Sequence, residues 1–165
     1  MNGNIILIGM PGCGKSTCGV LAAKALCKAF VDTDLLIQEA EGCGLQEIIA
    51  KKGNDYFART EERILSEADF TNTIIATGGS AVYYDSAMQH LKAGGKAVYL
   101  KISYEEMMRR IRNIKTRGIL LAEGETMEDL YRRRCALYEK YADLTVDCDG
   151  TDVEAAVEKI CRSCI

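Results

Sequence analysis

One glycine-rich segment near the N-terminus constrains the fold of this chain more than any other feature. Residues 9–16 fit the pattern G-x-x-x-x-G-K-[ST] in full. The segment follows an uninterrupted apolar strand predicted over residues 4–9 and precedes a helix predicted over residues 14–27, which is the setting that a phosphate-binding loop requires. A strand, such a loop and a helix are the first unit of a parallel α/β sheet.

The residue types in this loop suit the binding of ATP with Mg²⁺. Gly12 and Gly14 can adopt backbone angles that turn N–H groups onto phosphate oxygens, and the following helix directs its positive end at the same anion. Lys15 would reach the β- and γ-phosphates as a catalytic group, and the Ser16 hydroxyl would bind Mg²⁺. The alternative is a glycine-rich turn that binds nothing. We predict that the nucleotide site includes Gly12, Cys13, Gly14, Lys15, Ser16 and Thr17, with Cys13 contributing through its backbone.

Apolar patterns along the rest of the chain alternate between strand-like and helix-like, which predicts an α/β class. The further strands are expected at residues 29–32, 73–77, 96–101 and 144–147. Two helices, at residues 45–52 and 55–68, separate the second strand from the third, and such an insertion is a place to build a substrate site. With 165 residues, 48% of them hydrophobic, we expect a single domain over residues 1–165.

Charge and hydropathy exclude several function classes. The net charge of −3 provides no basic surface for a phosphate backbone, so we expect no nucleic-acid partner. The longest early apolar run, residues 5–8, is too short to span a membrane or to form a signal peptide. We therefore expect a cytoplasmic protein without a membrane partner, and a monomer.

Eight cysteines allow two interpretations, a disulfide framework or reduced thiols. Because the chain is long for a disulfide scaffold and shows no export signal, reduced thiols are expected. Cys161 and Cys164 have the spacing of zinc ligands, but a zinc site needs two more ligands, and the only histidine, His90, lies in an unrelated segment.

Two aspartates end the second predicted strand beside the phosphate-binding loop. Residues two apart in an extended chain point to the same side, so Asp32 and Asp34 would both lie at the carboxyl edge of the sheet. Asp32 could hold Mg²⁺ through a water, and Asp34 could accept the proton of an attacking hydroxyl as a catalytic base. Alternatively, one or both cap a helix that starts near Leu35. Their position beside the loop favours the functional interpretation.

Three further features are candidates for contacts with substrates. Gly78 and Gly79 follow the third strand, where glycines let a ligand approach the backbone, although a tight turn explains them equally well. Arg134 could bind a carboxylate in a bidentate manner, although most arginines in the run 132–134 should be solvated. Residues 109–124 carry five basic side chains and two glycines, which predicts a mobile basic lid.

The class of phosphate chemistry follows mainly from what the sequence lacks. Kinases, GTPases and ATPase motors share the loop, but no Asn-Lys-x-Asp guanine signature follows it and 165 residues leave no room for motor machinery. A kinase for a small molecule remains. We expect in-line transfer, with Lys15, Mg²⁺ and the lid residue Arg117 on the γ-phosphate and Asp34 on the acceptor.

In combination, these motifs resemble the shikimate kinase family over essentially the whole chain. The matching pieces are residues 9–17, the Asp-Thr-Asp at 32–34, Phe57 with Glu61, Gly78-Gly79, Arg117, and Arg134-x-x-Leu-Tyr138. The resemblance implies a three-layer α/β/α P-loop NTPase fold with a five-stranded parallel sheet in the order 2-3-1-4-5. It also implies a substrate-binding insertion at about residues 33–62, a lid at about 109–124, and the ATP-dependent conversion of shikimate to shikimate 3-phosphate in aromatic amino acid biosynthesis.

The same resemblance assigns roles to individual residues. Asp34 would bind hydroxyls of the acceptor, Arg134 its carboxylate, and Gly79 a ring hydroxyl. Arg117 would approach the phosphates from the lid. Arg110 would lie against the adenine, near the segment 149–151.

Three departures from the family pattern fall where the acceptor would be recognised. The family's Phe-Arg-x-x-Glu has Ala58 in place of the arginine, its third glycine is Ser80, and its lid Arg-Pro continues here with Gly118. Arg59 restores Arg-x-x-Glu with a shift of one residue and is a candidate for substrate binding. A shift of one residue rotates a side chain by about 100° around the helix, however.

These departures leave three hypotheses. The first is a shikimate kinase in which Arg134 carries most of the carboxylate binding. The second is a sibling kinase whose pocket Ala58 and Ser80 have reshaped for another small hydroxy acid or polyol. The third is a nucleotide-binding regulatory protein without catalysis, which is disfavoured by the intact Lys15, Ser16, Asp32 and Asp34.

Overall fold

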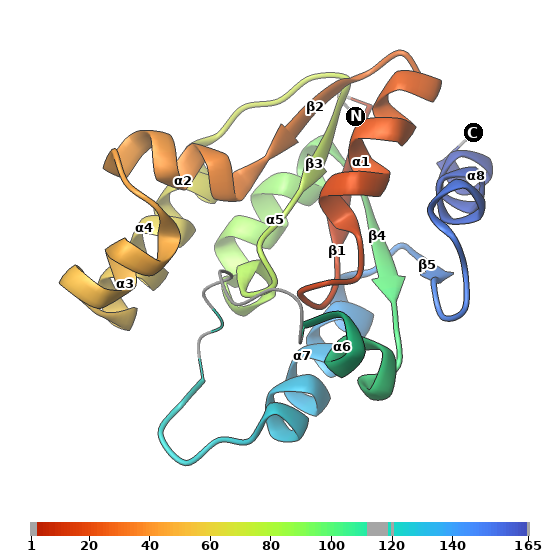
Figure 1. Cartoon of the computed structure of the whole chain (residues 1–165). Coiled ribbons are helices and arrows are strands. Elements are labelled where there is room, and N and C mark those ends of the chain that lie inside the picture. The colour runs from red at the N-terminus through yellow and green to blue at the C-terminus, as the bar shows by residue number, and fades with distance from the viewer. Residues whose placement is uncertain (1–2, 112–118, 120, 165) are drawn as a thin grey trace.

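The core of the molecule is a five-stranded parallel sheet, seen in a computed structural model that describes residues 3–111, 119 and 121–164 (Figure 1). The strand order is β2-β3-β1-β4-β5, and each neighbouring pair is parallel. This order confirms the expected topology. The strands are β1 (Asn4–Ile8), β2 (Ala29–Asp32), β3 (Thr73–Ala76), β4 (Gly95–Lys101) and β5 (Leu144–Asp147).

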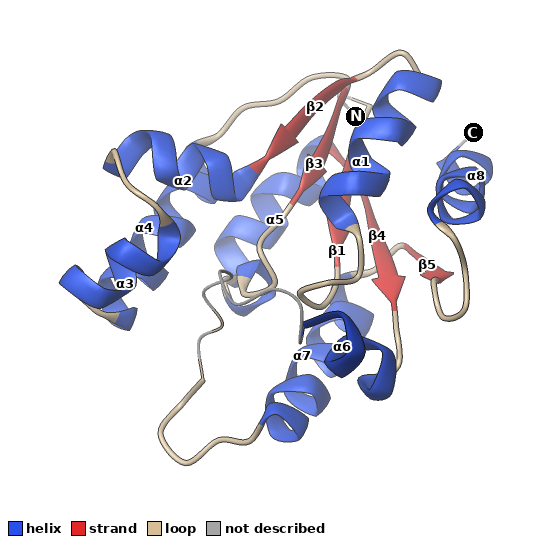
Figure 2. Ribbon diagram, in the orientation of Figure 1, coloured by secondary structure: helices blue, strands red, loops and turns tan. Residues whose placement is uncertain are grey.

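Helices cover both faces of the sheet and give the expected three layers (Figure 2). On one face α1 (Lys15–Ala25) packs against α8 (Val153–Cys164). On the other face α5 (Asp85–Gly94) and α7 (Met127–Tyr141) contact β4. The remaining helix of this half, α6 (Tyr104–Ile111), follows β4, and a short 3₁₀ turn, η1 (Ala81–Tyr83), precedes α5.

The central strand β1 shows why the sequence forms this sheet. All five of its residues are buried, and its apolar run has no polar alternation because helices cover both of its faces. Tyr99 on β4 and Tyr138 on α7 extend the core on one side, with ring centroids 5.2 Å apart. The phosphate-binding loop leaves directly from this rigid centre, so its position is set by the most buried part of the molecule.

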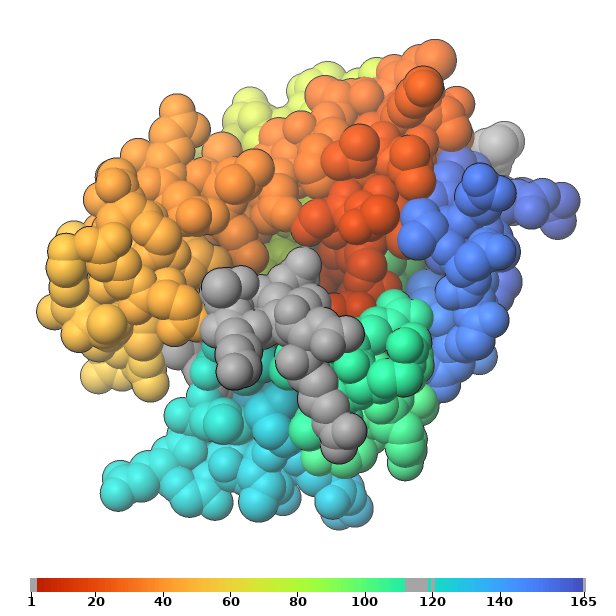
Figure 3. Space-filling view, viewed as in Figure 1, coloured from red at the N-terminus to blue at the C-terminus, as the bar shows by residue number. Residues whose placement is uncertain are grey.

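Between β2 and β3 the chain forms an insertion that projects beyond the sheet (Figure 3). It contains three helices, α2 (Thr33–Glu41), α3 (Leu45–Lys52) and α4 (Asn54–Glu67), which corrects the expectation of two. The third is α2, which was considered from the sequence only as an alternative, a helix starting near Leu35; it begins immediately after β2 with no turn residues between them. The three helices pack around a small apolar cluster of their own, Ile37, Ile48 and Phe57.

Two expectations about the surface and the thiols can be compared with the structure. In the part of the chain that is described, no helix combines the length and the apolar character needed to cross a membrane. All eight cysteines carry free thiols, as expected for reduced residues.

Candidate active site

The phosphate-binding loop has the backbone geometry that its glycines predict. Gly12 and Gly14 have φ angles of 82° and 98°, a left-handed conformation that residues with a Cβ rarely adopt. Gly14 is the N-cap of α1 and has no side chain to satisfy the first N–H groups of that helix. The loop and the positive end of α1 therefore present backbone donors to an anion.

Lys15 is held inside the loop. Its side chain is 5% exposed, and its ammonium donates to the carbonyl oxygens of Gly9 at 2.7 Å and Met10 at 3.0 Å. Cys13 is buried, and its Sγ lies 3.6 Å from Lys15 Nζ, so its side chain contacts the lysine. The loop thus places a positive charge at its own centre.

Ser16 and the two aspartates form a connected group at the carboxyl edge of the sheet. The Ser16 hydroxyl donates to Asp32 Oδ2 at 2.6 Å, and Asp32 Oδ1 accepts from the backbone N–H of Asp34 at 3.0 Å. Asp32 is therefore both the N-cap of α2, which was the capping alternative considered for it, and the partner of the loop serine. Asp34, in the first turn of α2, is half-buried beside this pair.

A hydroxyl and a carboxylate are hard oxygen donors of the kind that Mg²⁺ prefers. In the residues that the structure describes, no group of three or more His, Cys, Asp or Glu side chains is arranged as a metal cage. Mg²⁺ bound with a nucleotide takes most of its ligands from phosphates and water. Ser16 and Asp32 fit such a site.

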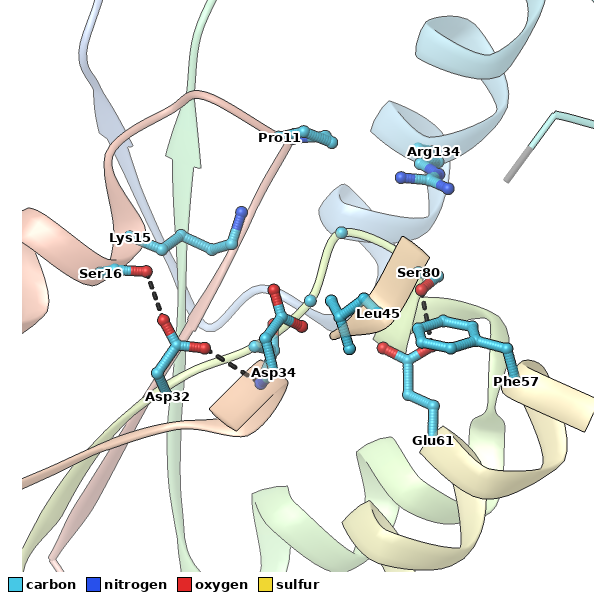
Figure 4. A pocket seen from close by; sticks show the side chains of 13 residues that line it. Pro11, Lys15, Ser16, Asp32, Asp34, Leu45, Phe57, Glu61, Ser80 and Arg134 are labelled. Atoms are coloured by element: carbon cyan, nitrogen blue, oxygen red, sulfur yellow. Dashed lines mark hydrogen bonds between the residues drawn. The ribbon is translucent and has the colours of Figure 1, made fainter. Parts of the chain in front are cut away.

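A single cleft gathers residues from the ends of β1, β2 and β3 and from α3, α4 and α7 (Figure 4). In the close-up, Asp34 lies between the Ser16–Asp32 pair at one end and Glu61 at the other. Most of the predicted acceptor residues are brought together here. The lining residues are Pro11, Lys15, Ser16, Asp32, Asp34, Leu45, Phe57, Glu61, Thr77, Gly78, Gly79, Ser80 and Arg134.

Gly78 and Gly79 lie where side chains converge. A Cβ on Gly79 would lie 2.8 Å from Arg134 Nη1, closer than real Cβ atoms come to other atoms. The backbone of the turn is also fixed from two sides, since Gly78 N–H donates to Thr33 Oγ1 at 3.2 Å and Tyr138 OH donates to Gly79 O at 2.6 Å. The segment is therefore a tight turn that also forms part of the cleft wall. The absence of side chains on its glycines leaves room for Asp34, Glu61 and Arg134.

Arg134 differs from the other arginines in its run because it is 2% exposed, whereas Arg132 and Arg133 face solvent. Its Nε donates to Tyr83 OH at 3.1 Å, and its guanidinium lies 5.3 Å from the centre of the Tyr83 ring. Among the described residues, no carboxylate forms an ion pair with it. A buried cation of this kind favours an anionic ligand, because burial without a counter-charge is costly.

Glu61 on α4 is fully buried at the wall of the cleft. Its Oε2 accepts from Ser80 Oγ at 2.6 Å and from Tyr84 OH at 3.0 Å, whereas Oε1 has no hydrogen-bond partner among the described residues. Burial raises the pKa of Glu61 to about 7, against the hydrogen bonds from Ser80 and Tyr84, which lower it; Asp34 nearby raises it further. Glu61 thus titrates near neutral pH.

Sequence reasoning found Glu61 only as part of a motif and gave it no role. It treated Ser80 as a departure from the family pattern and did not single out Tyr83 or Tyr84. The available signal was their order, since two tyrosines follow Gly78-Gly79-Ser80 within a few residues. The residues that these tyrosines contact, Glu61 on α4 and Arg134 on α7, are distant in sequence.

Some predicted site residues lie outside the cleft. Arg59 is exposed and lines a separate hollow beside α3 with Lys52 and Tyr56, as the rotation of about 100° per residue requires. Thr17 is exposed on α1. Arg117 and Gly118 lie outside the described residues, as does half of the predicted lid, residues 112–118 and 120.

Arg110 on α6, expected to lie against the adenine, contacts both the phosphate-binding loop and the residue that follows β5. Its Nη1 donates to Gly12 O at 3.2 Å and its Nη2 to Cys148 O at 3.5 Å, while Glu106 Oε1 accepts from its Nε at 2.6 Å. The guanidinium is thereby held between the phosphate-binding loop and the end of β5.

Comparison with known proteins agrees with this geometry. A model of the family "Shikimate kinase" matches residues 11–165. The shikimate kinase of Clostridium botulinum is 38% identical in an alignment 165 residues long. The alignment covers 97% of this chain and 95% of that protein. The structure of shikimate kinase from Aquifex aeolicus superimposes with a TM-score of 0.82 at 32% identity, covering 97% of this chain and 95% of that one.

A second solved structure, shikimate kinase from Acinetobacter baumannii in complex with shikimate, gives a TM-score of 0.83 at 30% identity and covers 97% of this chain and 89% of that one. Near-complete coverage in sequence and in structure, together with a P-loop cleft of this composition, leads to one conclusion. The chain belongs to the shikimate kinase family.

Proposed function

We propose that this protein transfers the γ-phosphate of ATP to a hydroxyl of shikimate, forming shikimate 3-phosphate. The observation that carries the proposal is the arrangement of charges in one cleft (Figure 4). Lys15 and the Ser16–Asp32 pair lie at one end, the buried cation Arg134 lies towards the other, and Asp34 stands between them. Along the cleft, these groups suit in turn the phosphate of the donor, the reacting hydroxyl of the acceptor and the carboxylate of the acceptor.

The donor half binds ATP through the backbone N–H groups of the loop and through Lys15, which is already held among the loop carbonyls. Ser16 and Asp32 would hold Mg²⁺, which would neutralise charge on the phosphates. The adenine lies beside Arg110, which joins the loop to the end of β5. Arg117, which lies outside the described residues, is the residue we propose for the γ-phosphate.

The acceptor half binds shikimate through Arg134 and Asp34. Arg134 takes the carboxylate, because a guanidinium fixed by Tyr83 keeps its outer nitrogens for a bidentate partner. Asp34 accepts a hydrogen bond from the reacting hydroxyl and then its proton as the O–P bond forms. Positioning of the reactants and stabilisation of charge supply most of the rate enhancement, as in other phosphoryl transfers.

An ADP-release assay with shikimate, quinate and gluconate as acceptors tests the proposal. We expect ADP release that depends on shikimate and Mg²⁺, with the phosphorylated product confirmed by mass spectrometry. No turnover with shikimate and clear turnover with another acceptor would instead identify a sibling kinase whose pocket Ala58 and Ser80 have altered. ADP release that no acceptor stimulates would contradict kinase function altogether.

A further inference from the structure

We propose that Tyr83 is a positioning residue for the acceptor, because it fixes the guanidinium of Arg134 in the orientation that receives the acceptor's carboxylate. Arg133, which is paired with Glu125, supports the ring of Tyr83 in turn. The inference rests on the proposed function, which gives Arg134 the carboxylate. None of the other three residues is part of the motifs by which this chain resembles its family.

The orientation of Arg134 matters because the cleft holds few cations. Among the described residues that line it, Arg134 carries the one guanidinium, and Lys15 belongs to the phosphate-binding loop. The family pattern provides another arginine at residue 58, where this chain has Ala58, and Arg59 lines a separate hollow. A guanidinium binds a carboxylate best when two parallel N–H donors point at it. Carboxylate binding here therefore depends on how one side chain is held.

Tyr83 holds Arg134 by two contacts that fix its direction. Arg134 Nε donates to Tyr83 OH at 3.1 Å, and the centre of the Tyr83 ring lies 5.3 Å from the guanidinium carbon of Arg134. On another side, Arg134 Nη1 lies 2.8 Å from the point that a Cβ on Gly79 would occupy. With Nε occupied, the nitrogens left for a ligand are Nη1 and Nη2. A side chain that is already held spares the ligand the entropy cost of ordering it.

The backbone of Tyr83 is fixed by the segment that also forms part of the cleft wall. Tyr83 ends η1, which follows directly from the turn at residues 78–80, and its N–H donates to Ser80 O at 3.0 Å. The other two residues of η1 are buried, and η1 packs against α7, the helix that carries Arg134. A compact element of the fold therefore places the tyrosine.

Arg133 contacts the same ring and has its own counter-charge. Its guanidinium carbon lies 5.1 Å from the centre of the Tyr83 ring, and its Nη2 pairs with Glu125 Oε1 at 2.7 Å. An aromatic ring attracts cations, but two cations at one ring repel each other. Glu125, whose side chain is 9% exposed, neutralises Arg133 and so reduces that repulsion. The charge that stays available to an anionic ligand is that of Arg134.

Steady-state ADP release with shikimate and with its methyl ester, in Tyr83→Phe and in the unaltered protein, tests the inference. The substitution removes the hydroxyl that accepts from Arg134 and keeps the ring. With shikimate we expect KM to rise about three- to tenfold, while kcat and the KM for ATP stay within about twofold. The ester has no carboxylate charge, so its kcat/KM should be the same in both proteins. A general disturbance of the fold would instead lower kcat/KM for both acceptors alike.

Matched control variants separate positioning from a change of structure. Tyr131→Phe also removes a tyrosine hydroxyl at α7, but this hydroxyl donates to Ile102 O at 2.8 Å, so the KM for shikimate should be unchanged. Arg133→Gln removes the cation beside the Tyr83 ring and should raise the KM for shikimate about two- to threefold. Arg132→Gln removes the neighbouring arginine, which pairs with Glu128 instead, and should leave that KM unchanged.

The outcomes separate this inference from the proposed function. Phosphorylation of shikimate with an unchanged KM in Tyr83→Phe, or with an equal loss for shikimate and its ester, would overturn the inference alone. Absence of shikimate phosphorylation by the unaltered protein would overturn both. If Tyr83→Phe does not fold or the ester is not turned over, Arg133→Gln and Arg132→Gln decide. An equal KM for shikimate in these two variants would also contradict the inference.

Discussion

The substitution Ala58→Arg introduces a cation at the position where this chain departs most clearly from its family. Ala58 is half-buried on α4, three residues before Glu61, and residues three apart lie on the same side of a helix. An opposite charge within about 4–6 Å lowers the pKa of a carboxyl by about 1–3 units. Since the pKa of Glu61 is raised to about 7, the new arginine should leave Glu61 ionised throughout the neutral range.

The effect on the acceptor follows from the same geometry. The new guanidinium lies beside the cleft wall and shares its donors between Glu61 and the carboxylate of shikimate. A hydrogen bond to a charged group contributes about 1.5–3 kcal/mol. Because the arginine is partly occupied by Glu61, we expect the lower end of this range, which corresponds to about tenfold tighter binding of shikimate. Glu61 should also stay ionised between pH 6 and 8, so its titration should not contribute to the pH dependence of stability in this range.

Calorimetric titration with shikimate and steady-state ADP release measure the change in affinity. Ala50→Arg on α3 is a matched control, since it makes the same chemical change at an exposed alanine of the same insertion, and its affinity for shikimate should be unchanged. Equal or weaker binding of shikimate by Ala58→Arg, with nucleotide binding and folding intact, would refute the reasoning. The pocket would then be built around alanine for a different acceptor.

Three other substitutions test individual contacts. Asp34→Asn should reduce turnover by at least about 10²-fold while leaving nucleotide affinity unchanged; retained turnover in the ADP-release assay would eliminate Asp34 as an essential base. Ser16→Ala removes the hydroxyl that donates to Asp32 at 2.6 Å and should raise the Mg²⁺ concentration needed for half-maximal activity, measured by Mg²⁺ titration. Gly79→Ala places a Cβ 2.8 Å from Arg134 Nη1, so the KM for shikimate should rise with little change in the KM for ATP; an equal rise in both would indicate a general disturbance.

The donor half of the site could be predicted from the sequence because its determinants are local. The glycines, Lys15 and Ser16 lie within one short motif, and an apolar strand and a helix on either side fix where that motif must stand. The strands were placed with errors of about one residue for the same reason, since each is a short apolar run with clear limits. Helix α2 was considered only as the alternative to a functional role, because the residue that caps it, Asp32, is also a candidate site residue.

The acceptor half could be predicted only in part because its properties depend on tertiary packing. The sequence offers three adjacent arginines, and only the packing of α7 makes Arg134 the buried one. Likewise, Glu61 acquires its raised pKa from burial and from partners 19 and 23 residues away. Helical periodicity did indicate that Arg59 would point away from the position of residue 58, and the structure places it outside the cleft.

Selectivity in this cleft would arise as much from the cost of wrong ligands as from contacts with the right one. Arg134 is buried without an ion pair among the described residues, and Glu61 keeps one buried oxygen without a donor. A polyol that lacks a carboxylate would displace water from Arg134 without replacing its charge. A carboxylic acid without hydroxyls would give Asp34 no group to deprotonate. Only an acceptor with both features satisfies the two ends of the cleft together, which is why shikimate fits it better than a simple acid or a simple polyol.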